Sequence, residues 1–206
     1  HYLALNTDTF KKIGQLAKCS PVLRTKEVQS ELWQKIEEGA LNAVASDHSP
    51  APASMKANPN DNIFDVWGGI SGAQNNVDLF YDIAVKSHRL SVFQFVQLIA
   101  AGPAELFGLG NKGSLEIGKD ADIILLDPTQ SYTLTKDDLF YKNKISAYVG
   151  WTIHDRITQT ILRGKTIFTL QNGFNTKPDG KFLINQHVKE AAANAINTHA
   201  KQTILN

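Results

Sequence analysis

Residues 41–50 read Leu-Asn-Ala-Val-Ala-Ser-Asp-His-Ser-Pro, an apolar stretch that runs into a polar cluster. The first seven, Leu41 to Asp47, have the length and composition of a short buried strand. A strand with an acidic cluster at its C-terminal end, set between helices, is typical of a β/α barrel, because such barrels build their sites on the loops at that end. The stretch therefore predicts an α/β fold with a site near residue 47.

The residues before this stretch have helical spacing. Thr7 or Asp8 is expected to cap a helix that runs through about Lys18. A second helix is predicted over Lys26 to Glu38, with Gly39 as its stop.

The residues after it predict a loop and two more helices. The loop, rich in Pro, Asn and Asp, runs from Ser49 to about Asn62, and the helices cover Ser71 to Ser87 and Ser91 to Ala101. Gly102-Pro103 is expected to break the last helix, with a short helical turn through Leu106.

Beyond about residue 110 the pattern changes to strands. Ala121 to Leu126 is a compact apolar strand stopped by Asp127-Pro128. Arg156 to Leu162 and Lys165 to Leu170 alternate like paired strands around Arg163-Gly164, a plausible hairpin turn.

These patterns divide the chain into three parts. Residues 1–110 are predicted to be α/β, residues 111–174 all-β, and residues 175–206 a polar linker with a helix over about 185–200. A whole β/α barrel takes about 250 residues, so the first part has room for only two or three βα units. The chain also begins with His1 rather than Met. We therefore expect a partial chain whose fold needs the missing half.

Composition excludes several classes of function. The 206 residues are 42% hydrophobic, and 21 Lys and Arg against 20 Asp and Glu leave a net charge of +1 without a basic stripe, which argues against nucleic-acid or membrane partners. No apolar run approaches the roughly 18 residues of a membrane span. The single cysteine, Cys19, excludes an internal disulfide and fits a cytoplasmic setting.

Asp47 is the strongest candidate for chemistry. A carboxylate at the end of a buried strand is costly unless it is paired, hydrogen-bonded or bound to a metal. It could bind a metal and accept a proton from an activated water. The alternative is a structural aspartate that caps the following turn through backbone amides, and spacing alone favours this alternative.

Other polar residues favour structural roles. His48 would point away from Asp47 on a regular strand, so we expect it to pack or hydrogen-bond rather than bind the same metal. Asp120 and Asp122 lie in a turn that leads into a strand, and Cys19 has no visible histidine partner. The remaining histidines, including His1, show no ligand spacing.

Several short motifs resemble the cyclic amidohydrolases. They are Lys18-Cys19-Ser20-Pro21-Val22-Leu23-Arg24, Ser46 to Pro50, Trp67-Gly68-Gly69-Ile70-Ser71-Gly72, and residues 112–122. His1-Tyr2 also resembles the end of the family's Cys-Pro-His-Tyr stretch. Ser-Asp-His-Ser-Pro together with Trp-Gly-Gly-Ile is most similar to the allantoinase branch, although Val22 and Ala51 depart from its usual residues. The resemblance covers residues 1–174.

The resemblance implies the C-terminal part of a (β/α)8 barrel, followed by strands of a small β-sandwich. It implies a site with two zinc ions, held by a His-x-His pair, a carboxylated lysine, two histidines and an aspartate. Only the aspartate matches this chain, as Asp47. Ser20 and Ser49 would lie near the substrate, and the Trp67-Gly68-Gly69 loop would line its pocket.

The activity implied for the complete protein is hydrolysis of allantoin to allantoate, with assembly into a homo-oligomer such as a tetramer. The 206 residues alone are expected to be inactive. Hydantoinase or dihydroorotase activity, a non-catalytic scaffold, and a stand-alone module completed by a partner are the alternatives. The interpretation depends on Asp47 facing a metal site, so a carboxylate turned to solvent would count against it.

Overall fold

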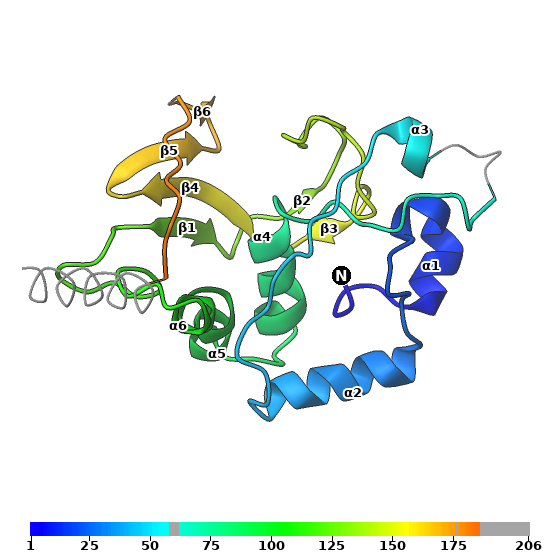
Figure 1. Ribbon diagram of the computed structural model, residues 1–206, viewed down its shortest axis with the longest axis horizontal. Coiled ribbons are helices and arrows are strands. Elements are labelled where there is room, and N and C mark those ends of the chain that lie inside the picture. The colour runs from blue at the N-terminus through cyan, green and yellow to red at the C-terminus, as the bar shows by residue number, and fades with distance from the viewer. Residues whose placement is uncertain (58–61, 176, 186–206) are drawn as a thin grey trace, which may run out of the picture.

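The computed structural model describes residues 1–57, 62–175 and 177–185. The helix predicted over about 185–200 therefore lies outside the described residues, apart from its first position. Within the described part, helices occupy the first half of the chain and strands the second (Figure 1). No helix in this part is long and apolar enough to cross a membrane.

Two groups of helices form the first half (Figure 1). The group before the polar loops consists of α1 (Thr7–Ile13), the 3₁₀ turn η1 (Gly14–Ala17) and α2 (Lys26–Glu37). The group after it consists of the one-turn α3 (Ala53–Lys56), α4 (Asn76–Tyr81) with the π turn η2 (Asp82–Lys86), α5 (Val92–Val96), the π turn η3 (Gln97–Ala101) and α6 (Gly102–Leu106).

The first helix has a different cap from the one predicted. The side chain of Asn6, rather than Thr7 or Asp8, accepts hydrogen bonds from the amides of Asp8 and Thr9. Asn6 precedes the first helical turn with extended backbone, which lets its side-chain oxygen Oδ1 reach two of the amides that lack helical partners. The second helix is confirmed, with Gly39 beyond its end at a φ of 76°.

Helix α4 begins at Asn76, five residues later than predicted. The amides of Gly72 and Ala73 donate to His48 Nδ1, and the amide of Gln74 donates to the Tyr141 hydroxyl. Because these three amides already have partners outside a helix, the segment before Asn76 forms a loop.

The prediction that Gly102-Pro103 breaks the helix over Ser91 to Ala101 is wrong. Gly102 has helical φ and ψ of −59° and −48°, and α6 continues directly from η3. The widened π turn lies just before Pro103, where an α-helical register would require an amide that proline lacks. A Cβ at Gly102 would lie 1.8 Å from the Asn42 carbonyl oxygen, so the glycine lets this helix pack directly on the segment at residue 42.

The buried strand predicted over Leu41 to Asp47 is also wrong for this chain. These residues have no regular secondary structure and no ladder partners among the described residues, and all are exposed or half-buried. Their contact with α5–α6 includes the Val44 amide, which donates to the Leu98 carbonyl at 2.9 Å. A parallel strand needs hydrogen-bonded neighbours on its edges. The described residues supply one isolated parallel bridge nearby, between His48 and Ile70.

The second half contains the predicted strands. A four-stranded antiparallel sheet has the order β1 (Ile123–Asp127), β4 (Arg156–Leu162), β5 (Lys165–Thr169) and β6 (Gly173–Phe174). A two-stranded ladder joins β2 (Tyr132–Thr133) to β3 (Thr152–Ile153). The predicted hairpin turn is confirmed, since Arg163 and Gly164 both have positive φ, 48° and 77°.

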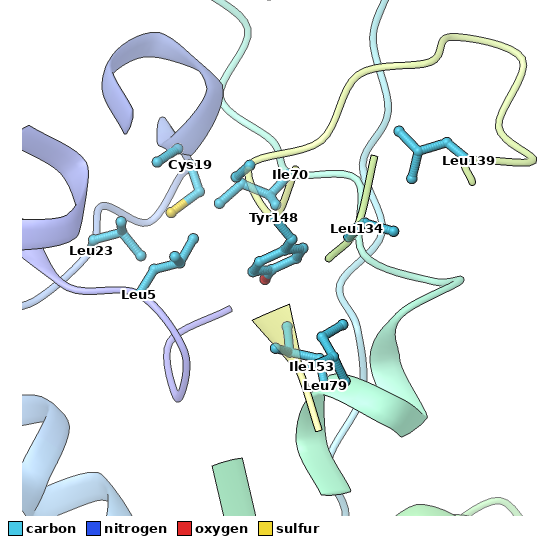
Figure 2. Packing of buried hydrophobic residues seen from close by; sticks show 11 residues of the cluster. Leu5, Cys19, Leu23, Ile70, Leu79, Leu134, Leu139, Tyr148 and Ile153 are labelled. Carbon is cyan, nitrogen blue, oxygen red and sulfur yellow. The ribbon is translucent and has the colours of Figure 1, made fainter. Parts of the chain in front are cut away.

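One hydrophobic core joins the two halves (Figure 2). Leu5 and Cys19 from the N-terminal part pack in the same cluster as Leu134, Tyr148 and Ile153 from the strand-rich part. Cys19 is thus a packing residue, as predicted. A second cluster holds α2 against α4 and α5; it contains Trp33, Ile36, Phe80, Ala84, Leu90, Phe95 and Leu98.

Candidate active site

Two loops that are distant in sequence lie side by side. The Ser49 amide donates to the Ile70 carbonyl at 3.0 Å, and His48 forms a parallel bridge with Ile70. His48 Nδ1 accepts from the amides of Gly72 and Ala73 at 3.1 and 3.2 Å. His48 therefore hydrogen-bonds to the neighbouring loop, which is one of the two roles predicted for it.

The predicted substrate residues come together in this place. The Ser20 amide donates to the Gly68 carbonyl at 3.2 Å, and Trp67 Nε1 donates to the Ser49 carbonyl and hydroxyl oxygens at 3.3 and 3.2 Å. A Cβ at Gly68 would lie 2.6 Å from Ser20 Oγ, and one at Gly69 would lie 2.3 Å from Ser49 Oγ. A side chain at Gly69 would also lie 2.5 Å from Ser49 Cβ and 2.7 Å from Trp67 Nε1, so Ser49 and Trp67 would have to move. At Gly68 the close atom is the Ser20 hydroxyl, and its rotation would relieve the contact.

Asp47 lies at the edge of this cluster with its carboxylate open. Its side chain is 72% exposed, in contrast to the covered carboxylate expected at the end of a buried strand. Among the described residues this is the outcome that counts against a metal-facing Asp47, and the buried His1 imidazole beside it is the observation in favour of one. No amide among the described residues donates to it, so the alternative of a turn-capping aspartate is not observed either. Its φ of 46° is a left-handed conformation that costs a non-glycine residue of order 1 kcal/mol.

His1 is the nearest basic partner of Asp47, and spacing gave no indication of it. His1 Nε2 lies 3.8 Å from Asp47 Oδ2, with the imidazole only 2% exposed. Both ring nitrogens are buried without a hydrogen-bond partner in the described part of the chain. The only sequence signal was the resemblance of His1-Tyr2 to the family's Cys-Pro-His-Tyr stretch.

A cavity of about 190 Å³ adjoins the pair. His1 and Ser46 line it together with Gly72 and Tyr148. Asp47 itself is not in its wall, so the cavity reaches the pair through His1 and not through the carboxylate.

The donor set is consistent with part of a metal centre. A carboxylate oxygen and an imidazole nitrogen are both zinc ligands, and here neither is engaged by a regular hydrogen bond. Among the described residues, however, no group of three or more His, Cys, Asp or Glu is placed to hold a metal ion. Asp120 and Asp122, the other acidic pair, bind the Lys112 ammonium and are structural, as predicted.

Two lysines that the sequence did not single out hold the loops together. Lys56 Nζ donates to the carbonyls of Lys18 and Trp67, and Lys18 Nζ donates to those of Phe64 and Val66. A lysine in a polar loop gives no sequence signal of such a role, because most surface lysines look the same.

Polar loops that meet beside an open carboxylate and a buried imidazole have the arrangement in which β/α barrels build their sites. The chain belongs to the amidohydrolase family, whose model matches residues 8–167. This membership and the structural matches below define a TIM-barrel-like α/β fold.

Curated relatives in this family carry a specific name. The chain is 47% identical to an allantoinase of Escherichia coli O139:H28 (strain E24377A / ETEC) over 184 residues, covering 89% of this chain and 40% of the relative. It is 46% identical to an allantoinase of Salmonella newport (strain SL254) with the same coverage. The chain thus spans about two fifths of the length of the relatives it matches.

Solved structures of similar fold are hydantoinases. The L-hydantoinase (dihydropyrimidinase) of Arthrobacter aurescens is 26% identical, with a TM-score of 0.77 over 89% of this chain and 39% of its own. The D-hydantoinase (dihydropyrimidinase) of a Thermus species is 26% identical, with a TM-score of 0.82 over 89% of this chain and 41% of its own.

Proposed function

We propose that this chain is the C-terminal part of a metal-dependent hydrolase that opens the hydantoin ring of allantoin to give allantoate. Residues 1–110 would complete a (β/α)8 barrel, residues 111–174 would contribute strands to a β-sandwich, and residues 175–206 would form a tail. The 47% identity to curated allantoinases over 89% of the chain carries the proposal. The assembled cluster of Ser20, Ser49 and the Trp67-Gly68-Gly69 loop supports it.

Asp47 would serve as both metal ligand and proton carrier. Its open oxygens accept no amide donors from the described residues, which leaves them available to a cation. Two divalent metals, zinc by family resemblance, would supply Lewis acidity and lower the pKa of water. An Asp47 oxygen would take the proton of the attacking water and deliver it to the departing ring nitrogen. His1, 3.8 Å away, would orient the carboxylate.

The substrate would lie against the loop cluster. Ser20 and Ser49 would present backbone and hydroxyl groups to the ring amides, while Trp67 would cover one face of the ring. The glycines at 68 and 69 leave the backbone accessible, because no side chain projects from it. The remaining metal ligands would come from residues outside this chain, so the 206 residues alone would be inactive.

The surroundings of the complete protein follow from the same proposal. Its substrate would be a small molecule rather than nucleic acid or a membrane, in keeping with a net charge of +1. We propose a cytoplasmic location and a homo-oligomeric assembly, such as a tetramer, by analogy with the family.

A hydantoinase is the second candidate, favoured by the structural matches with TM-scores of 0.77 and 0.82. The complete protein, purified with zinc, should be assayed on allantoin, hydantoin and dihydroorotate. We expect kcat/KM for allantoin to exceed the other two by at least about 100-fold, since a site that hydrogen-bonds a substrate's ureido group discriminates strongly against analogues without it. Preference for hydantoin would establish the second candidate instead, and no turnover of any ring would indicate a scaffold.

A further inference from the structure

Lys56 is a buried lysine that forms no ion pair with an acidic side chain among the residues that the structure describes. The residue is 4% exposed, although it follows the exposed Met55 at the end of α3. Its Nζ donates to the Lys18 carbonyl at 2.5 Å and to the Trp67 carbonyl at 3.0 Å. Burying an ammonium group costs free energy unless its N–H groups donate hydrogen bonds, so both contacts stabilise the buried position of Lys56.

The two carbonyls belong to the two loops of the candidate site. Lys18 lies two residues before Ser20, and Trp67 is followed directly by Gly68 and Gly69. The same two loops meet where the Ser20 amide donates to the Gly68 carbonyl at 3.2 Å. The Lys56 side chain thus hydrogen-bonds to the backbones of both the loop that carries Ser20 and the loop that carries the two glycines.

A second lysine reinforces the arrangement from the outside. Lys18 Nζ donates to the carbonyls of Phe64 and Val66 at 3.0 and 2.6 Å, and the Trp67 amide donates to the Met55 carbonyl at 2.9 Å. Lys18, Lys56 and the carbonyls they bind therefore form what we call the lysine clamp. Its two ammonium groups donate to these carbonyls as charged donors.

We propose that Lys56 is a positioning residue, which sets the separation of the Ser20 and Trp67–Gly69 loops and thereby the affinity of the site for its cyclic amide substrate. The proposal rests on the proposed function for the identity of that substrate, but the clamp itself does not depend on it. Lys56 would act through the loops and would not touch the substrate.

The charge state of the side chain agrees with this role. Burial is the main cause that lowers the pKa of Lys56, Cys19 opposes it, and the nearby Lys18 ammonium adds to it. The net pKa is about 8. The amino group therefore remains mostly protonated at neutral pH and makes charge-assisted hydrogen bonds, which are about twice as strong as neutral ones.

The test is Lys56→Met in the complete zinc-loaded protein, because methionine keeps the length and apolar stem of the side chain without its donors. We expect KM for allantoin to rise about tenfold while kcat changes less than about threefold and zinc content stays constant. Lys86→Met is the matched control, since Lys86 Nζ also donates to a backbone carbonyl, that of Pro128, away from the site. It should leave KM and kcat unchanged.

Amide hydrogen exchange gives a readout that needs no turnover. The Ser20 and Trp67 amides should exchange at least about fivefold faster in Lys56→Met than in wild type, and should be unchanged in Lys86→Met. This measurement separates the clamp from the proposed function: protein that turns over no allantoin can still show it. Should Lys56→Met fail to fold, Lys18→Met weakens the same clamp and should raise KM and both exchange rates in the same direction.

The proposal is overturned if exchange at Ser20 and Trp67 is unaffected by both substitutions, or if the KM of an active, folded variant stays at the wild-type value. Loss of kcat or zinc at unchanged KM would also overturn it, because that pattern assigns Lys56 to the metal centre or the chemistry instead of to loop position.

Discussion

Two apolar segments of this chain end in aspartate, and they have different structures. Leu41 to Asp47 has no regular secondary structure and no ladder partners among the described residues, whereas Ile123 to Asp127 is β1, paired along its length with β4. Both segments have enough apolar residues for a strand, and they differ in whether a partner strand is present. For β1 the partner is β4, which begins at residue 156, 29 positions after β1 ends at residue 127. For the first segment, the described residues provide no partner strand.

The two aspartates differ in the same way. Asp127 accepts hydrogen bonds from the Thr129 amide and hydroxyl and from Gln130 Nε2, and these contacts with Thr129 hold the pKa of its carboxyl below the usual value. Asp47 has no such donors and faces His1. An aspartate that caps its own turn is explained by local structure, and one that does not is a better candidate for a distant partner.

The largest expected effect would test this contrast directly. In the complete zinc-loaded protein, Asp47→Ala should lower kcat/KM for allantoin by about 10³-fold or more and reduce bound zinc, since both a ligand and a proton carrier are lost. Asp127→Ala, the matched control, should leave kcat/KM within about twofold. Steady-state kinetics and metal analysis check both, and near-normal turnover in Asp47→Ala would show that the uncapped carboxylate has no catalytic role.

A smaller effect should follow from the packing that positions residues 41–47. Gly102→Ala places a methyl group 1.8 Å from the Asn42 carbonyl oxygen, so the segment or α6 must move. We expect a loss of about 2–3 kcal/mol in the free energy of unfolding and a fall in kcat. Gly180→Ala meets nothing within 4 Å and is the control for thermal and denaturant unfolding. Equal stability of the two variants would mean that α6 does not fix this segment.

The smallest effect concerns the junction of the two halves. Asp155 is fully buried, neither carboxyl oxygen has a hydrogen-bond partner among the described residues, and burial with nearby Asp78 and Asp82 raises its pKa to about 8. Lys86 opposes that shift. A raised carboxyl pKa means that the folded state holds the proton longer, so stability falls as the pH rises from about 4 to about 8.

Asp155→Asn removes this titration. Its gain in the free energy of unfolding over wild type should therefore grow between pH 5 and pH 8, by at least about 1.4 kcal/mol, the equivalent of one pKa unit. Urea unfolding at the two pH values measures it. A gain independent of pH would place the proton-binding group elsewhere.

Local patterns predicted the elements that are stabilised by contacts close in sequence. The helix over 26–37 and the hairpin around Arg163-Gly164 need only their own turns, caps and near neighbours, and both are present. The cap at Asn6 was missed by one residue, because several adjacent polar side chains satisfy the same pattern. The continuity of α5 with α6 was missed because the π turn before Pro103 lets the helix continue past the proline, and no feature of the composition marks such a turn.

The sequence predicted which residues make up most of the candidate site, but not the contacts that hold them together. Motif resemblance selected Asp47, Ser20, Ser49 and the Trp67-Gly68-Gly69 loop, and the structure gathers the serines and the loop into one hydrogen-bonded cluster. Whether these residues bind substrate stays a prediction. His1 and Lys56 were missed because their partners are distant in sequence. The partner of His1 is 46 positions away, and those of Lys56 are 38 and 11 positions away.

The sequence by itself determined the family, the order of helices before strands, and the residues that turns and caps require, because these depend on side-chain chemistry over a few neighbouring positions. Only the tertiary structure decided that residues 41–47 lack strand partners here, that a buried lysine joins two loops, and that an imidazole lies beside an open carboxylate. Strand pairing, burial and side-chain contact are relations between distant segments, and their free energy exists only when those segments meet.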